Sequence, residues 1–322
     1  MLITTNITNS NVDTDRYRDA EDVRAFCRMH CLDGLELMPV GGSFELSCIP
    51  ESLVVGIHLP FYTNWYDFWV GDEAALMDEY QSMEVVRSVY GGDQPSALLD
   101  ALRKHLDFAQ KLRAKYVVFH VSNVTLPECM SYRFKHTDAE ICRAAAEFIN
   151  RLLDGRNDSF VFLVENLWWP GLTMTRPEVT RELMESIHTP RKGIMLDTGH
   201  MMHTNHSLRT QNEALEYIHR QLDAHGSMCD WIRGIHLHQS LSGSYVREAV
   251  KRDVQWKDTY WERRWQSTEH VLKIDRHEPF DTPNVRALIE RIAPAYLTHE
   301  FITNDRGQHD AYLQTQNRAV SE

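Results

Sequence analysis

Residues Gly193-Ile-Met-Leu-Asp-Thr-Gly-His200 join a short apolar run to a carboxylate and, three residues later, to an imidazole. An apolar run of this length is typical of a buried parallel strand. Asp197 then lies at the carboxyl end of the strand, and His200 lies on the first turn after it. An oxygen and a nitrogen ligand at one strand end suit a divalent metal, although Asp-Thr-Gly is also a common turn. The other strand ends therefore decide between a metal site and an ordinary turn.

Apolar runs of strand length alternate with helical patterns along the chain. Strands are predicted at 2–7, 34–39, 53–58, 116–120, 160–165, 193–197, 232–238 and 295–300. Helices are predicted at 20–31, 96–113, 138–153, 177–187, 211–225 and 283–292. This alternation favours parallel βαβ units, and eight repeats in roughly 300 residues match a closed (β/α)8 barrel, an α/β fold. An open doubly wound sheet would need a glycine-rich loop after its first strand, but residues 6–12 contain no glycine.

No linker rich in proline, glycine or serine divides the chain, so we expect residues 1–322 to form a single domain. Two long excursions, 61–95 and 239–281, interrupt the alternation and are expected over the rim of the barrel. Both contain several aromatic residues. We weigh packing or an oligomer contact, such as a homodimer, equally against a substrate lid.

Composition and charge argue against several classes of protein. The net charge of −12 gives no general basic footprint, so a nucleic-acid partner is not expected. The apolar runs are strand-sized and the first residues lack a signal-peptide pattern, so no membrane association is expected. The six cysteines show no paired spacing and are interpreted as reduced thiols, which is typical of a cytoplasmic protein.

Six successive strands of the predicted barrel finish in a residue that can bind a metal. These residues are His58, His120, Glu165, Asp197 with His200, His236 with His238, and Glu300. The second excursion adds Asp275 and His277. The active site of such a barrel is built where the carboxyl ends of the strands meet. A lone strand-end histidine is more often a core residue, but six strands in register indicate a shared metal site.

The same residues carry a family resemblance. The chain resembles the xylose-isomerase-like TIM barrels, a superfamily that includes sugar phosphate isomerases, epimerases and endonuclease IV. The motifs are Gly56-Ile-His58, Phe119-His120, Val164-Glu165-Asn166, Leu196-Asp197-Thr-Gly-His200, Gly234-Ile-His236, Asp275-Arg-His277 and Thr298-His-Glu300. The resemblance implies a basic metal set at Glu165, Asp197, His236 and Glu300. Its endonuclease-IV-like branch implies further ligands at His58, His120, His200, Asp275 and His277, and so one to three ions.

One interpretation is a metal-dependent isomerase or epimerase of a sugar or sugar phosphate. A divalent ion would hold the substrate carbonyl and acidify the neighbouring C–H group. Glu165 and Glu300 would transfer the proton, and His200 would bind a substrate oxygen. Further substrate contacts are predicted at Glu36, Tyr62, Trp65, Trp168, Trp169 and His238, although the aromatic residues could equally serve packing.

The alternative is a hydrolase of the endonuclease IV type, with a phosphodiester clamped between two or three ions. However, segment 239–281 is longer than the compact turn expected of that enzyme, and its basic residues alternate with acidic ones. A non-catalytic scaffold is a third interpretation, but nine candidate ligands exceed the four of a structural zinc site. The sequence therefore predicts an isomerase or epimerase of a small sugar-like molecule, with zinc or manganese favoured and iron or cobalt allowed.

Overall fold

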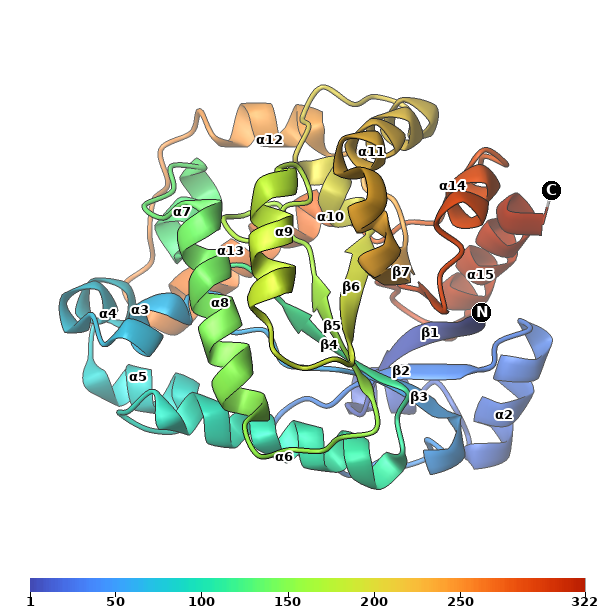
Figure 1. Cartoon of the computed structure of the whole chain (residues 1–322), viewed down its shortest axis with the longest axis horizontal. Coiled ribbons are helices and arrows are strands. Elements are labelled where there is room, and N and C mark those ends of the chain that lie inside the picture. The colour runs from blue at the N-terminus through green and yellow to red at the C-terminus, as the bar shows by residue number, and fades with distance from the viewer. Residues whose placement is uncertain (322) are drawn as a thin grey trace.

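A computed structural model describes residues 1–321 as a closed parallel barrel surrounded by helices (Figure 1). The strands are β1 (Leu2–Thr8), β2 (Gly34–Met38), β3 (Val54–His58), β4 (Tyr116–His120), β5 (Val161–Glu165), β6 (Lys192–Asp197), β7 (Ile232–Leu237) and β8 (Tyr296–His299). Each strand pairs with the next, and β8 returns to β1 and closes the barrel. The predicted (β/α)8 TIM barrel is confirmed.

The outer layer consists mainly of helices that follow the strands. They are α1 (Asn11–Thr14), α2 (Ala20–Met29), α6 (Ser96–Leu112), α8 (Asp138–Leu153), α9 (Pro177–Ser186), α11 (Gln211–His225), α14 (Val285–Ile292) and α15 (Arg306–Ser321), with short 3-10 turns at Glu51–Leu53 and Gly226–Trp231. Helix α15 was not predicted, because the side that it buries includes His309 and Gln316 and so lacks a clear apolar stripe.

Both long excursions fold into further helices, which the sequence analysis did not predict. The first contains α3 (Tyr66–Val70), α4 (Glu73–Tyr80) and α5 (Met83–Tyr90). The second contains α12 (Gly243–Ala249) and α13 (Tyr260–Ile274). Helix α13 packs against α7 (Leu126–Ser131), which follows β4, and α10 (Thr198–His203) follows β6 directly. The helices α7, α10 and α13 therefore belong to the segments that come after the carboxyl ends of strands β4, β6 and β7 (Figure 1).

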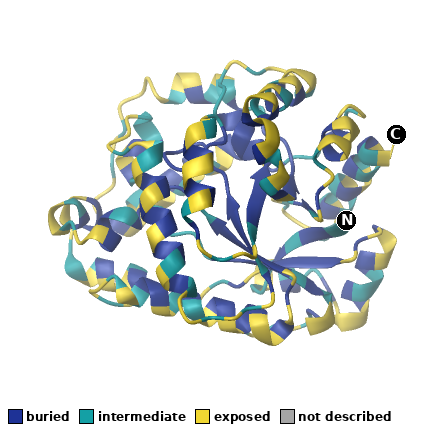
Figure 2. Cartoon of the chain, viewed as in Figure 1, coloured by how far each residue is buried: buried dark blue, intermediate teal, exposed yellow. Residues whose placement is uncertain are grey.

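The barrel strands are largely buried, and the surrounding helices expose only their outer sides (Figure 2). Tyr116, Val118, Leu163 and Met195 form a small apolar cluster of their own inside the barrel. Gly56 makes room for one of them, because a Cβ there would lie 2.3 Å from the Tyr116 ring. Side chains thus fill the amino-terminal part of the barrel, as in other eight-stranded barrels.

The helices of residues 1–321 include none that is both long enough and apolar enough to cross a membrane.

Candidate metal centre

The carboxyl ends of the strands and the second excursion bring four groups of potential metal ligands together, and three of these groups share members. Within each group, the ligand atoms all lie within 4.8 Å of one another. The groups are His58 with His120 and Glu165; Glu165 with Asp197, His236 and Glu300; His200 with His238, Asp275 and His277; and Glu36 with His58 and His236. All nine residues that the sequence analysis named as possible ligands therefore lie in this centre.

Glu165 ends β5 and is fully buried, and its two carboxylate oxygens face different histidines. Glu165 Oε2 lies 3.2 Å from His58 Nε2 and 3.0 Å from His120 Nε2. Glu165 Oε1 lies 3.2 Å from both His200 Nδ1 and His236 Nδ1. One carboxylate thus belongs to two groups of ligands, which is the arrangement that a bridging ligand between two ions requires.

His236, at the centre of the second group, shows that these residues fit a cation. His236 Nδ1 lies 3.2 Å from Glu165 Oε1 and 3.2 Å from Glu300 Oε2. Yet these three buried atoms form no hydrogen bond with any described residue. Buried polar atoms that converge without pairing are costly unless something else satisfies them, and a divalent cation suits this donor set. We conclude that the residues present fit a metal ion.

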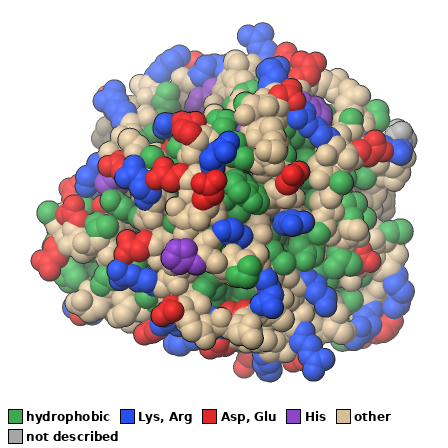
Figure 3. Space-filling view, viewed as in Figure 1, with side chains coloured by type: hydrophobic (Ala, Val, Ile, Leu, Met, Phe, Trp, Pro, Cys, Tyr) green, Lys and Arg blue, Asp and Glu red, His purple; other side chains and the backbone are tan. Residues whose placement is uncertain are grey.

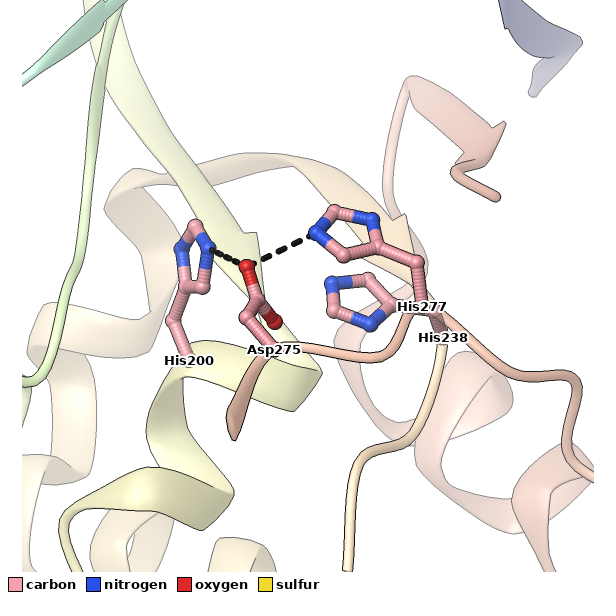
Figure 4. A group of neighbouring side chains, drawn as sticks. All are labelled: His200, His238, Asp275 and His277. Carbon is pink, nitrogen blue, oxygen red and sulfur yellow. Dashed lines mark hydrogen bonds and ion pairs between the residues drawn. The ribbon is translucent and has the colours of Figure 1, made fainter. Parts of the chain in front are cut away.

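The third group includes two residues of the second excursion (Figure 4). Asp275 Oδ2 lies 3.2 Å from His200 Nε2 and 2.8 Å from His277 Nε2. The rings of His238 and His277 are stacked, with centroids 3.9 Å apart. His238, predicted as a substrate contact, is therefore placed among the potential ligands.

The turn after β6 orients two of these side chains. Asp197 Oδ1 caps α10 by accepting a 2.6 Å hydrogen bond from the His200 amide, and Asp197 Oδ2 is left to face His238 Nε2 at 2.9 Å. Asn166 links the ends of β5 and β6, because its side chain bonds both the amide and the carbonyl of Asp197. Only glycine fits at position 199, because a Cβ there would lie 2.0 Å from His238 Cε1.

Glu36 lies beneath His236 in the barrel interior and is 1% exposed. Its carboxylate accepts hydrogen bonds from the hydroxyls of Tyr116 at 2.7 Å and Thr298 at 3.0 Å, and its Oε1 lies 3.0 Å from His236 Nε2. A carboxylate on the second nitrogen of a histidine fixes the orientation of that ring toward a metal. Glu36 is also one of the potential ligands, beside His58 and His236, and its predicted contact with substrate stays a prediction.

The aromatic residues predicted to contact substrate lie in three different places. Trp168 and Trp169 line a cavity of about 210 Å³ together with His120, His200 and Asp275. Tyr62 lines a separate, larger cavity. Trp65 is 3% exposed, donates its indole N–H to the Ser122 carbonyl at 2.8 Å and packs against Phe148. Trp65 therefore serves packing, which was the other interpretation weighed for it.

His203 is a member of the centre that the sequence analysis missed. It lies on α10, is buried, and places Nε2 3.2 Å from Asp275 Oδ1. Its Nδ1 lies 3.3 Å from the Ser242 hydroxyl. The signal was present in the sequence, because His200 and His203 are three residues apart and so share one side of a helix.

Electrostatics couple these carboxylates and imidazoles strongly. Burial raises the pKa of the Glu165 carboxyl, but the facing His120 and His236 outweigh burial and lower it well below its ordinary value. Burial lowers the pKa of His277, but the Asp275 and Glu300 carboxylates outweigh burial and raise it to about 9. Where the carboxylates raise the pKa of a histidine, as for His277, a metal ion would displace the proton of that histidine on binding.

A closed parallel barrel whose mouth gathers buried histidines and carboxylates is a TIM barrel with side chains that suit a divalent metal. Residues 19–313 match the family model of the xylose isomerase-like TIM barrel, and the chain belongs to this family. The resemblance that the strand-end motifs predicted is therefore confirmed. A search of curated proteins finds no match to this chain.

Several solved structures share the fold at low sequence identity. Endonuclease IV from Thermus thermophilus is 14% identical with a TM-score of 0.52, and the match covers 100% of this chain and 99% of that chain. L-ribulose 3-epimerase is 10% identical with a TM-score of 0.52, over 100% and 95% of the two chains. The IOLI protein with a binding zinc atom is 13% identical with a TM-score of 0.50, over 100% and 98%. At these identities the likeness shows the fold alone.

Proposed function

We propose that this protein is a multinuclear, metal-dependent phosphoesterase that acts on a small substrate. The observation that carries this proposal is the place of His200, which lines the cavity but also lies with His238, Asp275 and His277 in one group of potential ligands. A single-ion isomerase would need only the group around His236. In such an enzyme Asp275 and its three histidines would form a second buried charged cluster that binds no ion. A buried charged cluster of this kind is costly to retain.

Two or three ions in such a centre supply a clamp for a phosphate ester and a hydroxide at neutral pH. The protein's own contribution is to hold the ligands at fixed positions before substrate arrives. Glu165 belongs to both the group with His58 and the group with His236. Asp275 contacts His200 and His277 in the third group, and Glu36 orients the His236 ring. Rigid placement of this kind lowers the cost of organising the transition state.

The cavity beside the centre supports a small substrate. Its volume is about 210 Å³, below the range typical of drug-sized ligand pockets, and residues of α13 form one of its walls. Trp169 Nε1 is buried at this cavity and has no acceptor among residues 1–321, so it is available to a substrate oxygen. Basic and acidic side chains are interspersed on the side of the molecule shown in Figure 3.

A second candidate is the isomerase or epimerase predicted from the sequence. Trp168 and Trp169 beside His120 and His200 favour it, because aromatic walls suit the C–H face of a sugar. The group of Glu165, Asp197, His236 and Glu300 would suffice for one ion. In this case Glu165 and Glu300 would transfer the proton and His200 would bind a substrate oxygen. This reaction stays a prediction.

Hydrolysis assays of the metal-loaded protein separate the two candidates. We expect turnover of bis(p-nitrophenyl) phosphate or p-nitrophenyl phosphate that is lost in Glu165→Gln. The matched control, Glu216→Gln on the exposed side of α11, should keep full activity. Absence of ester hydrolysis, together with solvent deuterium uptake next to the carbonyl of L-ribulose or D-fructose, would reject the phosphoesterase in favour of the isomerase.

A further inference from the structure

We call the 210 Å³ cavity lined by Trp168, Trp169 and His200 the metal-side cavity. A second cavity of about 580 Å³ lies next to it. Loops after β2 and β3 form part of its wall, and α4, α5, α6 and α13 supply the rest. Its walls include Phe44, Tyr62, Tyr90 and Tyr260, and we call it the aromatic chamber. Its volume lies within the range typical of ligand-binding pockets. The chamber is therefore large enough for a ring system that the metal-side cavity could not hold.

The aromatic chamber and the metal-side cavity share part of their walls. Phe61, Thr63 and Arg264 line both of them. The Phe61 ring lies 4.7 Å from the ring of His120, a potential metal ligand, in an edge-to-face arrangement. One ligand could thus extend from the metal centre past Phe61 into the chamber.

Two cations line the chamber without a carboxylate partner. Neither Lys104 nor Arg264 lies within 4.0 Å of a carboxylate in the described part of the chain. Arg264 instead lies over the Trp261 ring, 5.7 Å from its centroid. Both side chains are exposed and have no carboxylate partner among the described residues, so they can pair with an anionic group of a ligand in the chamber.

His105 supplies an independent indication. It lines the chamber, is 7% exposed, and its Nδ1 is buried with no hydrogen-bond partner among residues 1–321. Its ring packs against Phe44 with centroids 4.9 Å apart. An unpaired polar atom in a cavity wall is costly in the empty protein, and a polar ring atom of a ligand would satisfy it.

We infer that the aromatic chamber binds the non-reacting part of the substrate, a planar ring that carries an anionic group, while the ester phosphate lies at the metal centre. This inference rests on the proposed phosphoesterase function. A planar ring can stack on the tyrosine and phenylalanine walls, and its anionic group can pair with Lys104 and Arg264. An alkyl chain would leave both cations and His105 Nδ1 unpaired, so a lipid tail does not fit.

Calorimetric titration of the full-length, metal-loaded protein tests this inference with four probes. 4-Carboxybenzylphosphonate, which cannot be hydrolysed as an ester, has a ring, a ring-bound anion and a phosphonate for the metal centre. Benzylphosphonate lacks the ring-bound anion, methylphosphonate lacks the ring, and inorganic phosphate reports on the metal centre. We expect 4-carboxybenzylphosphonate to bind at least about 10-fold more tightly than each of the other three. Lys104→Gln and Arg264→Gln should each weaken its binding about 10-fold while the affinity for inorganic phosphate stays the same. Lys111→Gln on α6 and Lys273→Gln on α13 are matched controls that leave the chamber intact.

The inference is overturned if 4-carboxybenzylphosphonate binds no more tightly than benzylphosphonate or methylphosphonate, or if the chamber variants bind it as the controls do. Failure of the proposed function has a different signature. In that case the wild-type protein would not hydrolyse the nitrophenyl esters, whatever its affinity for the phosphonates. Metal content of the chamber variants, measured in parallel, should equal that of the controls and so exclude misfolding as the cause of weaker binding.

Discussion

The interior of the barrel and its mouth are built from the same eight strands, but they differ in how their polar side chains are paired. Hydroxyl groups in the interior form hydrogen bonds, whereas two carboxylate oxygens at the mouth form none within residues 1–321. In the interior, the hydroxyls of Thr4 and Thr298 lie 2.9 Å apart, and the Tyr116 hydroxyl donates to Glu36. At the mouth, Glu165 Oε1 and Glu300 Oε2 are buried and form no hydrogen bond with the residues described. A protein retains unpaired buried oxygens where a ligand satisfies them. The comparison indicates that the interior contributes stability and that the mouth suits a divalent cation.

Removal of the bridging charge at the mouth should have the largest effect. Glu165→Gln keeps the size of the side chain but removes the carboxylate that faces four histidines. We expect esterase activity to fall about 10³-fold or more and metal content to drop, with unfolding little changed. Elemental analysis and the nitrophenyl assay measure both effects. Full metal content in this variant would contradict the assignment of the metal site to the mouth of the barrel.

The matching change in the interior is Leu163→Ala, which removes a fully buried side chain from the apolar cluster. The loss of packing and the cavity should lower the free energy of unfolding by about 2–5 kcal/mol. Metal content per folded chain should stay at the wild-type value. Urea denaturation measures the first quantity and elemental analysis the second. Loss of metal with unchanged stability would contradict the division between the two regions.

Glu36 joins the two regions and should show an intermediate effect. Glu36→Gln replaces the carboxylate beside His236 Nε2 with a neutral amide. We expect metal affinity to weaken about 10–100-fold, because the imidazole loses the partner that orients it. Competition with a chromophoric chelator gives the affinity. Tyr116→Phe, which removes only one donor to Glu36, is the milder control.

The acid sensitivity of folding should come partly from outside the mouth. His309 on α15 is buried with Nε2 2.9 Å from the Thr5 hydroxyl, and burial lowers its pKa to about 4. Because this pKa lies below that of an unfolded histidine, the neutral ring stabilises the fold above about pH 6.5, and this contribution is lost as the pH falls toward 4. We expect a loss of about 2 kcal/mol between pH 8 and pH 5. Denaturation curves of His309→Gln should be flatter over this range; equal slopes in both proteins would refute this source.

His203 should give the smallest of these effects on metal binding. His203→Leu removes the imidazole beside Asp275 Oδ1 but leaves Asp275 Oδ2 facing His200 and His277. We expect the affinity of one ion to fall about 10-fold, while the ions held by Glu165 are unaffected. Stepwise metal titration resolves the ions. Equal weakening of every ion would show that His203 supports the fold rather than Asp275.

The barrel could be predicted from sequence because its strands are short apolar runs that end in chemically distinctive residues. Helix α15 escaped prediction because tertiary contacts, rather than an apolar stripe, hold it: Gln316 donates to the Leu237 carbonyl at 2.8 Å. In the sequence, the short helices α4 and α5 are indicated only by their N-cap residues, Asp72 and Ser82. Such single residues are weak signals in a segment that otherwise resembles a loop.

The ligand types at the mouth could also be predicted, but their grouping could not. Glu36 and His236 are 200 residues apart in sequence, and only the closed barrel brings them into contact. Whether His200 faces substrate or Asp275 likewise depends on where the second excursion returns to the rim. His203 is different, because its spacing from His200 was visible and could have been used.

The central claim is that the mouth holds more than one metal ion. Elemental analysis of the purified full-length protein, with the protein concentration from amino-acid analysis, tests it most directly. The three groups around Glu165, His236 and Asp275 predict two or three divalent ions per chain. One ion per chain or none, after exposure to excess zinc or manganese and removal of the free metal, would contradict the account.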